Sequence, residues 1–219
     1  MFAGHIGVAL AVGRVERRVN LGVFVTCALL LDILLWLFIL LGWESVGIPP
    51  DFVATHQPYF EFPYSHGLLA AVAWAALAGA LAVPMYSRLG KAKWRAAVLI
   101  VVAVFSHWLL DALVHRPELP LVGGNSAGVG LALWNHMPVA LALEAAIVAL
   151  GMYLYIPGSG LSRGKSIALI LLGTFIVAFT VIGMTVAPPP PSAMAMAGST
   201  LITLIVVCVV FAWVGRSPP

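Results

Sequence analysis

The chain has 219 residues, of which 62% are hydrophobic and only 9% are charged, and its mean hydropathy is +1.07. A soluble domain carries about 25% charged residues, so this composition excludes a water-soluble globular protein. The net charge of +3 is divided among short, separate basic segments, which gives no indication of a nucleic-acid partner. We therefore expect a protein embedded in a membrane.

Six apolar runs are long enough to cross a membrane as α-helices, which requires about 20 residues each. They occupy residues 21–42, 65–86, 94–115, 129–156, 165–187 and 197–215. The alternating pattern of a transmembrane barrel strand is absent from them. The first dozen residues are also apolar, but as a helix they would extend only about 18 Å. The sequence therefore predicts an all-α integral membrane protein with six transmembrane helices plus a short N-terminal half-helix.

Basic residues alternate between the predicted connections. Lys and Arg gather before the first span, between the second and third spans, and between the fourth and fifth. The connection at residues 43–64 contains neither. Because cytoplasmic loops carry an excess of Lys and Arg, we expect the basic loops and the C-terminus to lie on the cytoplasmic side of an inner (plasma) membrane. The loops at 43–64, 116–128 and 188–196 would then lie outside.

Ionisable residues divide the chain into two regions. Several His, Asp and Glu residues lie within the first four spans, whereas the last two spans contain no ionisable residue between Lys165 and Arg216. Such a group costs about 2.5–3.5 kcal/mol inside a membrane, so a cluster of them predicts function. We predict a metal-hydrolase core over residues 1–156, made of the half-helix and four spans, and a C-terminal two-helix scaffold over residues 157–219.

The segment SHWLLDALVH, residues 106–115, is the most informative. His107 and Asp111 are four residues apart, so on a helix they share a face and lie about 6 Å apart along the axis. That spacing allows both side chains to reach one metal ion. His115 lies about 12 Å from His107 and is predicted to be too far away to share it. A wet cavity with purely structural hydrogen bonds explains an isolated pattern of this kind equally well.

Other polar residues fall in the same half of the predicted bilayer. By helical rise, Asp32 and His66 lie about 15 and 3 Å below the outer boundary, and His5 lies about 13 Å from the inner face. Metal bonds to His and carboxylate ligands are only about 2 Å long, so this spread is large for a single ion. Either helix tilt closes the gap, or two ions bind in layers.

The remaining ionisable residues have simpler interpretations. His56 lies in the outer loop and is expected to be solvated. Glu144 is expected to form a hydrogen bond with another helix. His136 lies just before Pro138, which is expected to kink the fourth span, and His136 itself is a weaker candidate for contact with metal or substrate.

Short motifs in a fixed order add a family resemblance. They are GHIG with His5, LLLD with Asp32, YSHG with Ser65 and His66, SHWLLDALVHRPELPL with His107, Asp111, His115 and Arg116, and VGLALWNH. With these motifs, residues 1–150 resemble the YdjM-like (LexA-binding, inner-membrane) family, which is described as metal-dependent hydrolases. The resemblance implies a membrane metal site, with lipid phosphoester cleavage as its reaction. Family members often have a Pro-Asp-x-Asp cluster where this chain has only Asp32.

The leading hypothesis is a membrane-embedded hydrolase that uses a divalent metal, zinc in one or two ions, on a lipid or lipid-linked phosphoester at the outer leaflet. The predicted metal ligands are His5, Asp32, His66, His107 and Asp111. His115 and His136 are the predicted catalytic residues, because imidazole transfers protons near neutral pH. Arg116 and Ser65 are predicted to bind the substrate, Arg116 through hydrogen bonds to phosphate.

Other functions fit the same residues. Intramembrane His and Asp also serve metal-ion and proton transporters, although the polar residues here stop near the midplane. Two histidines could hold a b-type haem, although the mixture with aspartate favours a metal ion. An amide-cleaving enzyme resembling the polytopic zinc ceramidases, or a protein that only binds a partner, are further alternatives.

Overall fold

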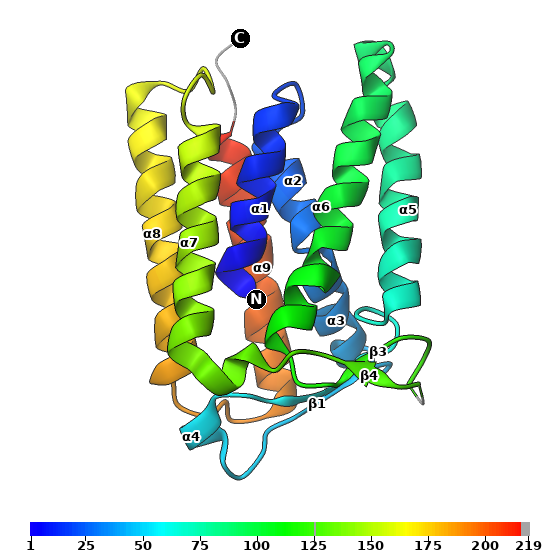
Figure 1. Cartoon of the computed structure of the whole chain (residues 1–219), viewed down its shortest axis with the longest axis vertical. Coiled ribbons are helices and arrows are strands. Elements are labelled where there is room, and N and C mark those ends of the chain that lie inside the picture. Colours follow the sequence, from blue (N-terminus) through cyan, green and yellow to red (C-terminus); the bar gives the residue numbers. More distant parts are fainter. Residues whose placement is uncertain (125, 216–219) are drawn as a thin grey trace.

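A computed structural model describes residues 1–124 and 126–215 as a bundle of long helices with two short hairpins at one end (Figure 1). The α-helices are α1 Phe2–Val15, α2 Leu21–Ala28, α3 Leu30–Leu40, α4 Phe52–Thr55, α5 Leu68–Met85, α6 Ala92–Val114, α7 Met137–Tyr155, α8 Arg163–Thr185 and α9 Ala193–Val214. Short 3-10 helices are η1 Ser87–Leu89 and η2 Leu133–His136. The strands β1 Ser45–Gly47 and β2 Tyr59–Glu61 form one antiparallel hairpin, and β3 Leu119–Pro120 and β4 Gly128–Val129 form another.

The predicted number of membrane spans is confirmed. Five helices are long and apolar enough to cross a membrane, and the bent pair α2–α3 adds a sixth when it is counted as one span. The apolar helix α1 is shorter and starts in the middle of the bundle, at the N label in Figure 1. We call the end with β1–β4 the hairpin end, and the opposite end, with loops 16–20, 86–91 and 156–162, the basic end.

The first span is not straight, because α2 and α3 meet at an angle of 54°. No proline or glycine lies at the joint, Leu29. Instead, the His107 side chain of α6 forms a hydrogen bond, Nδ1 to O, of 2.7 Å with the Ala28 carbonyl. In an uninterrupted helix this carbonyl would accept from the Asp32 N–H. A side chain that enters the hydrogen-bond ladder is a known cause of a sharp bend.

Helix α1 is packed closely on α7 through glycine. A Cβ atom on Gly7 would lie 2.5 Å from the Ile147 carbonyl oxygen, and one on Gly151 would collide with Gly7 itself. Small residues allow two backbones to approach in this way inside a membrane. The contact holds the half-helix, and with it His5, at a fixed depth.

Both ends of α1 are also tied to neighbouring helices. At the basic end, Glu16 is 1% exposed and pairs at 2.8 Å with both Arg18 and Arg95, the latter on α6. Hydrogen bonds from Arg18 and Arg95 lower the pKa of Glu16 to about 2, against the opposing effect of burial. At the other end, the Gly4 N–H donates to Glu144 Oε2 on α7 at 3.1 Å. The predicted role of Glu144 as a partner for another helix is thus confirmed.

Two predicted spans begin later than expected. The span predicted at 65–86 begins at Leu68, so His66 lies in the connection before α5. The span predicted at 129–156 begins as an α-helix at Met137, after β4 and η2. The predicted kink at Pro138 is wrong, because this proline lies in the first turn of α7, where its missing N–H breaks no helical hydrogen bond.

The last two helices are more than a covering scaffold. Helix α8 packs mainly on α7, whereas α9 packs on α2 and α3 and lies behind α1 in the middle of the bundle (Figure 1). Ser162 and Ser192 cap them by accepting backbone N–H groups, the latter directly after the Pro188–Pro191 segment. The two helices therefore pack directly on helices of the region predicted as the core, residues 1–156.

The close contact between α1 and α7 gives a first prediction. Gly7→Leu should destabilise the protein by about 1–3 kcal/mol, since the added side chain has no space beside Ile147. Thermal unfolding in detergent should show a fall of about 2–12 °C in melting temperature. Gly164→Leu is the matched control, because a Cβ there meets nothing within 4 Å. Equal melting temperatures for the two variants would contradict the role given to this contact.

Candidate metal centre and membrane cavity

Five side chains from four segments converge inside the bundle. His5 comes from α1, Asp32 from α3, His66 from the connection before α5, and His107 and Asp111 from α6. His5, His66, His107 and Asp111 are at most 2% exposed. All five belong to groups whose ligand atoms lie within 4.8 Å of one another and could hold a metal ion. The depths estimated from helical rise, which differ by about 12 Å between Asp32 and His66, are wrong, because bending and tilt of the helices bring these side chains to one depth.

Four ligand atoms form the tightest group, which we call the four-atom group: Asp32 Oδ1, His66 Nε2, His107 Nε2 and Asp111 Oδ2. His107 Nε2 lies 3.2 Å from both His66 Nε2 and Asp111 Oδ2. His66 Nε2 lies 3.4 Å from Asp111 Oδ2, and Asp32 Oδ1 lies 3.6 Å from each imidazole nitrogen. A tetrahedral zinc site with bonds of about 2.0–2.1 Å has edges of about 3.3 Å. Five separations among the four atoms, 3.2–3.6 Å, are close to the edges of such a site.

The outer hydrogen bond of His107 determines which ring nitrogen carries hydrogen. The Ala28 carbonyl can only accept, so the Nδ1 atom, 2.7 Å away, must be the donor. This leaves the Nε2 lone pair of neutral His107 directed at the four-atom group. Metal-binding histidines are held in this way by a carbonyl or carboxylate on the opposite nitrogen.

His66 is oriented by a longer chain of hydrogen bonds. Glu44 Oε2 accepts the Ser65 hydroxyl at 2.7 Å, and Ser65 Oγ lies 2.9 Å from His66 Nδ1. Because the hydroxyl hydrogen points to Glu44, Ser65 accepts the N–H of His66. Burial raises the pKa of Glu44, and hydrogen bonds from Ser65 and from the Tyr64 and Ser65 N–H groups oppose that rise. The ionised form of Glu44 therefore depends on these donors.

The two oriented imidazoles create an electrostatic requirement. Their Nε2 lone pairs face each other at 3.2 Å, beside the carboxylates of Asp32 and Asp111. Such an arrangement is repulsive unless positive charge lies among the four atoms. A proton relieves one pair of acceptors, whereas a metal cation would contact several at once, such as the atoms of His66, His107 and Asp111, which lie within 4.8 Å of one another. The donor set and its spacing therefore fit a divalent ion.

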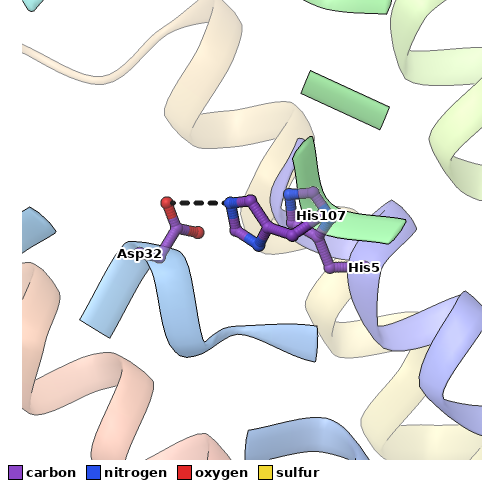
Figure 2. Close-up of side chains that lie close together, drawn as sticks. All are labelled: His5, Asp32 and His107. Atoms are coloured by element: carbon purple, nitrogen blue, oxygen red, sulfur yellow. Dashed lines mark ion pairs between the residues drawn. The ribbon is translucent and has the colours of Figure 1, made fainter. Parts of the chain in front are cut away.

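His5 completes the cluster in a different way. Its ring stacks on His107 with centroids 3.7 Å apart and planes within 9° (Figure 2). His5 Nε2 lies 3.2 Å from Asp111 Oδ1, yet neither ring nitrogen has a hydrogen-bond partner with good geometry among the described residues. An unsatisfied buried imidazole is costly, so His5 is a fitting additional ligand. The amino group of Met1 also contacts Asp111 Oδ1, at 2.7 Å.

A cavity of about 410 Å³ lies directly beside the cluster, on the side of the hairpin end. Asp32, His66 and Asp111 of the cluster line its inner end, Glu144, His115 and His56 add further ionisable groups, and most of the remaining wall is aromatic or aliphatic. Its volume is in the range of pockets for small organic molecules. The last two helices, predicted to be scaffold, supply part of this wall.

His115 lines the same cavity. Its Nδ1 lies 2.7 Å from Glu118 Oε1, and its Nε2 lies 3.8 Å from Asp111 Oδ2. The His115 ring therefore lies closer to the cluster than its predicted separation of about 12 Å from His107 indicated. An imidazole held by a carboxylate on one nitrogen has its other nitrogen free to exchange a proton in the cavity.

Three other predicted residues do not reach the cavity. His136 is exposed at the start of α7 and is not part of the cavity wall. Ser65 is 0% exposed and joins Glu44 to His66, so the structure places it behind the cluster instead of against a substrate. The Arg116 guanidinium lies 4.7 Å from the Tyr59 ring centre and 3.4 Å from the Gln57 carbonyl, also away from the cavity.

Sequence reasoning also missed residues that the tertiary fold recruits. His56 was expected to be solvated, but it is 7% exposed and lines the cavity. Glu44 and Glu118 orient His66 and His115 from the loops at the hairpin end. The three-residue spacing of His115 and Glu118 weakly indicated that these two side chains meet. Glu44 is 21 positions from Ser65, so no local pattern indicated their contact.

The Glu44–Ser65–His66 chain gives a second prediction. Ser65→Ala should weaken binding of a divalent ion by about 10–100-fold, because His66 loses the acceptor that orients it. Titration calorimetry with Zn²⁺ on metal-free protein measures this affinity. Ser45→Ala is the matched control, since Ser45 is an exposed hairpin serine that bonds only Glu61, at 3.2 Å. Unchanged affinity in Ser65→Ala would show that His66 needs no such support.

Comparisons of the chain with protein-family models, with curated proteins and with solved structures return no match. Function must therefore be inferred from the buried cluster and from the cavity that it faces.

Proposed function

We propose that this protein is a membrane-embedded, metal-dependent hydrolase that cleaves a phosphoester in a lipid or lipid-linked substrate. The observation on which this proposal rests is the group of His and Asp atoms at the end of an apolar cavity, in which five separations of 3.2–3.6 Å are close to the edges of a tetrahedral metal site. The same function is implied by the resemblance of residues 1–150 to the YdjM-like family, and we propose that relationship as well.

The donor set supports zinc as the metal. Two imidazoles and two carboxylates at these separations suit a borderline ion with four ligands, and His5 lies within reach for a change in coordination or a second ion. When bound, such a metal polarises a phosphoryl oxygen and activates water near neutral pH. His115, held by Glu118, is positioned to transfer a proton at the cavity wall.

The distribution of buried polar groups favours an enzyme over a transporter. Within the described ranges, every buried polar residue except Glu16 and Ser159 lies between the cluster and the hairpin end. Those two exceptions lie in loops of the basic end, so the bundle interior between them and the cluster is apolar. An ion that reaches the cluster from the hairpin side meets no polar route onward.

The basic loops support an orientation for the reaction. Lys and Arg gather at the basic end, which favours a cytoplasmic location for that end in an inner (plasma) membrane. The hairpin end and the cavity would then face the outer leaflet. A lipid or lipid-linked molecule of that leaflet is the corresponding substrate, and the C-terminal end of α9 would lie in the cytoplasm.

Metal analysis of the purified protein gives the third prediction. The unmodified chain should retain about one divalent ion, and His107→Ala and Asp111→Ala should each lose it, because each removes an atom of the four-atom group. Elemental mass spectrometry measures the content. His136→Ala and Asp51→Ala, which change exposed residues outside the cluster, are matched controls and should retain the ion. A chain that is metal-free, or variants with full metal content, would overturn the proposal.

Hydrolysis is then tested with a panel of phospholipids and isoprenoid phosphates in detergent micelles. We expect phosphate or phospho-headgroup release from at least one lipid. Release should stop on treatment with a chelator, return on addition of Zn²⁺, and be absent from His107→Ala. Metal flux through proteoliposomes without any hydrolysis would instead establish the transporter.

A further inference from the structure

The N-terminal end of α1 lies at mid-depth in the bundle (Figure 1), and Met1 and Phe2 line the cavity there. Residues of α3, α7, α8 and α9 line the rest of the cavity, together with the segment 52–62 toward the hairpin end. The polar cluster therefore faces one long cavity rather than the aqueous loops alone.

The wall formed by α8 and α9 reaches the surface of the molecule. Phe179 and Gly183 on α8, and Ser199 on α9, line the cavity and are nevertheless exposed. These helices pack chiefly on other partners, α8 on α7 and α9 on α2 and α3. The seam between α8 and α9 is consequently where the cavity opens sideways, at the level of the membrane.

The surroundings of this seam are apolar. Phe175 and Ile182 on α8 are 62% and 55% exposed, and Ile202 and Val206 on α9 are 64% and 53% exposed. Exposed side chains of this kind on membrane-spanning helices face lipid chains. Whatever passes through the seam therefore comes from the hydrocarbon layer.

Three hydroxyl groups on this wall are satisfied within their own helices. Thr180, Ser199 and Thr203 donate to carbonyl oxygens of their own helices, at 2.9, 2.8 and 2.9 Å. With these donors satisfied, the wall offers mainly carbon surface to an occupant. Carbon surface along the cavity and charge at its inner end are complementary to an amphiphile with a hydrocarbon chain.

We infer that the seam between α8 and α9 is a lateral entrance, and that the cavity binds one hydrocarbon chain of a membrane lipid with its polar end at Asp32, His66 and Asp111. The position of the lipid's polar end rests on the proposed function. The binding site for its hydrocarbon chain rests on the cavity wall formed by α8 and α9. The occupant is a lipid drawn from the bilayer, not a soluble phosphoester that enters from the aqueous side.

Gly183 allows the chain site to be blocked cleanly. Gly183 lines the cavity and a Cβ atom there meets nothing within 4 Å, so Gly183→Trp adds bulk at the cavity wall without a backbone collision. Gly198→Trp is the matched control, because Gly198 also has no atom within 4 Å of its Cβ but lies on a face of α9 outside the cavity wall. Ser199→Phe blocks the seam from α9 and replaces Gly183→Trp if that variant does not fold.

The probe is phosphatidic acid with a photoreactive diazirine near the end of one acyl chain, incorporated into bilayer nanodiscs with each variant. Illumination should attach it to wall residues such as Phe179, Met184 and Met196 in the unmodified chain. Attachment there should fall about tenfold or more in Gly183→Trp and remain unchanged in Gly198→Trp. Metal content should stay the same in both variants, which shows that the cluster is intact.

Cross-linking separates this inference from the proposed function, since it needs no hydrolysis. Attachment only to lipid-facing residues such as Ile202, or equal attachment in Gly183→Trp, would overturn the lateral chain site even if the protein hydrolyses a lipid. Attachment inside the cavity without hydrolysis of any lipid in the panel would leave the chain site standing and overturn the hydrolase.

Discussion

Two carboxylates held among apolar helices, Asp111 buried and Asp32 half-buried at the cavity, are the constraint on which the site depends. Asp111 is 1% exposed and has His5, His66, His107 and the Met1 amino group within 3.4 Å. Charge inside a membrane bundle persists only when it is paired or bound to an ion. His66 and His107 have outer hydrogen bonds that direct their Nε2 atoms toward the carboxylates, so in their neutral form they would add donors for a cation without cancelling the negative charge. A divalent cation satisfies both the charge and the donors.

The half-helix α1 lies on the basic side of this charged cluster. Close glycine contacts with α7 and the ion pairs of Glu16 hold α1 in the basic half of the bundle, and its N-terminal end brings His5 to the cluster. The same short helix therefore brings His5 to the cluster and lines the cavity beside it through Met1 and Phe2.

The bend in the first span links the backbone to the cluster. Inside a membrane every carbonyl needs a partner, and the Ala28 carbonyl finds one in His107 rather than in its own helix. The hydrogen bond from His107 stabilises the bend, and the same bond orients the His107 ring toward the cluster. Asp32 lies one turn beyond this joint, so its approach to the cluster depends on the direction that α3 takes after Leu29.

The amino-acid sequence by itself determined the membrane class, the number of spans and the short length of the first helix, because these follow from the length and hydropathy of single segments. It also determined the pairing of His107 with Asp111, which is a property of one helical turn. The convergence of His5, Asp32 and His66 on that pair could be suggested only by depth, and the estimated spread was too large, since helical rise carries no information on bend or tilt. The tertiary structure alone decided the buried positions of Glu44 and His56 and the cavity wall on α8 and α9. It also decided that Ser65, Arg116 and His136 lie outside the cavity wall. Apolar helices present similar surfaces on all sides, so which faces meet, and which loop residues fold over them, depends on contacts between distant segments that no local pattern records.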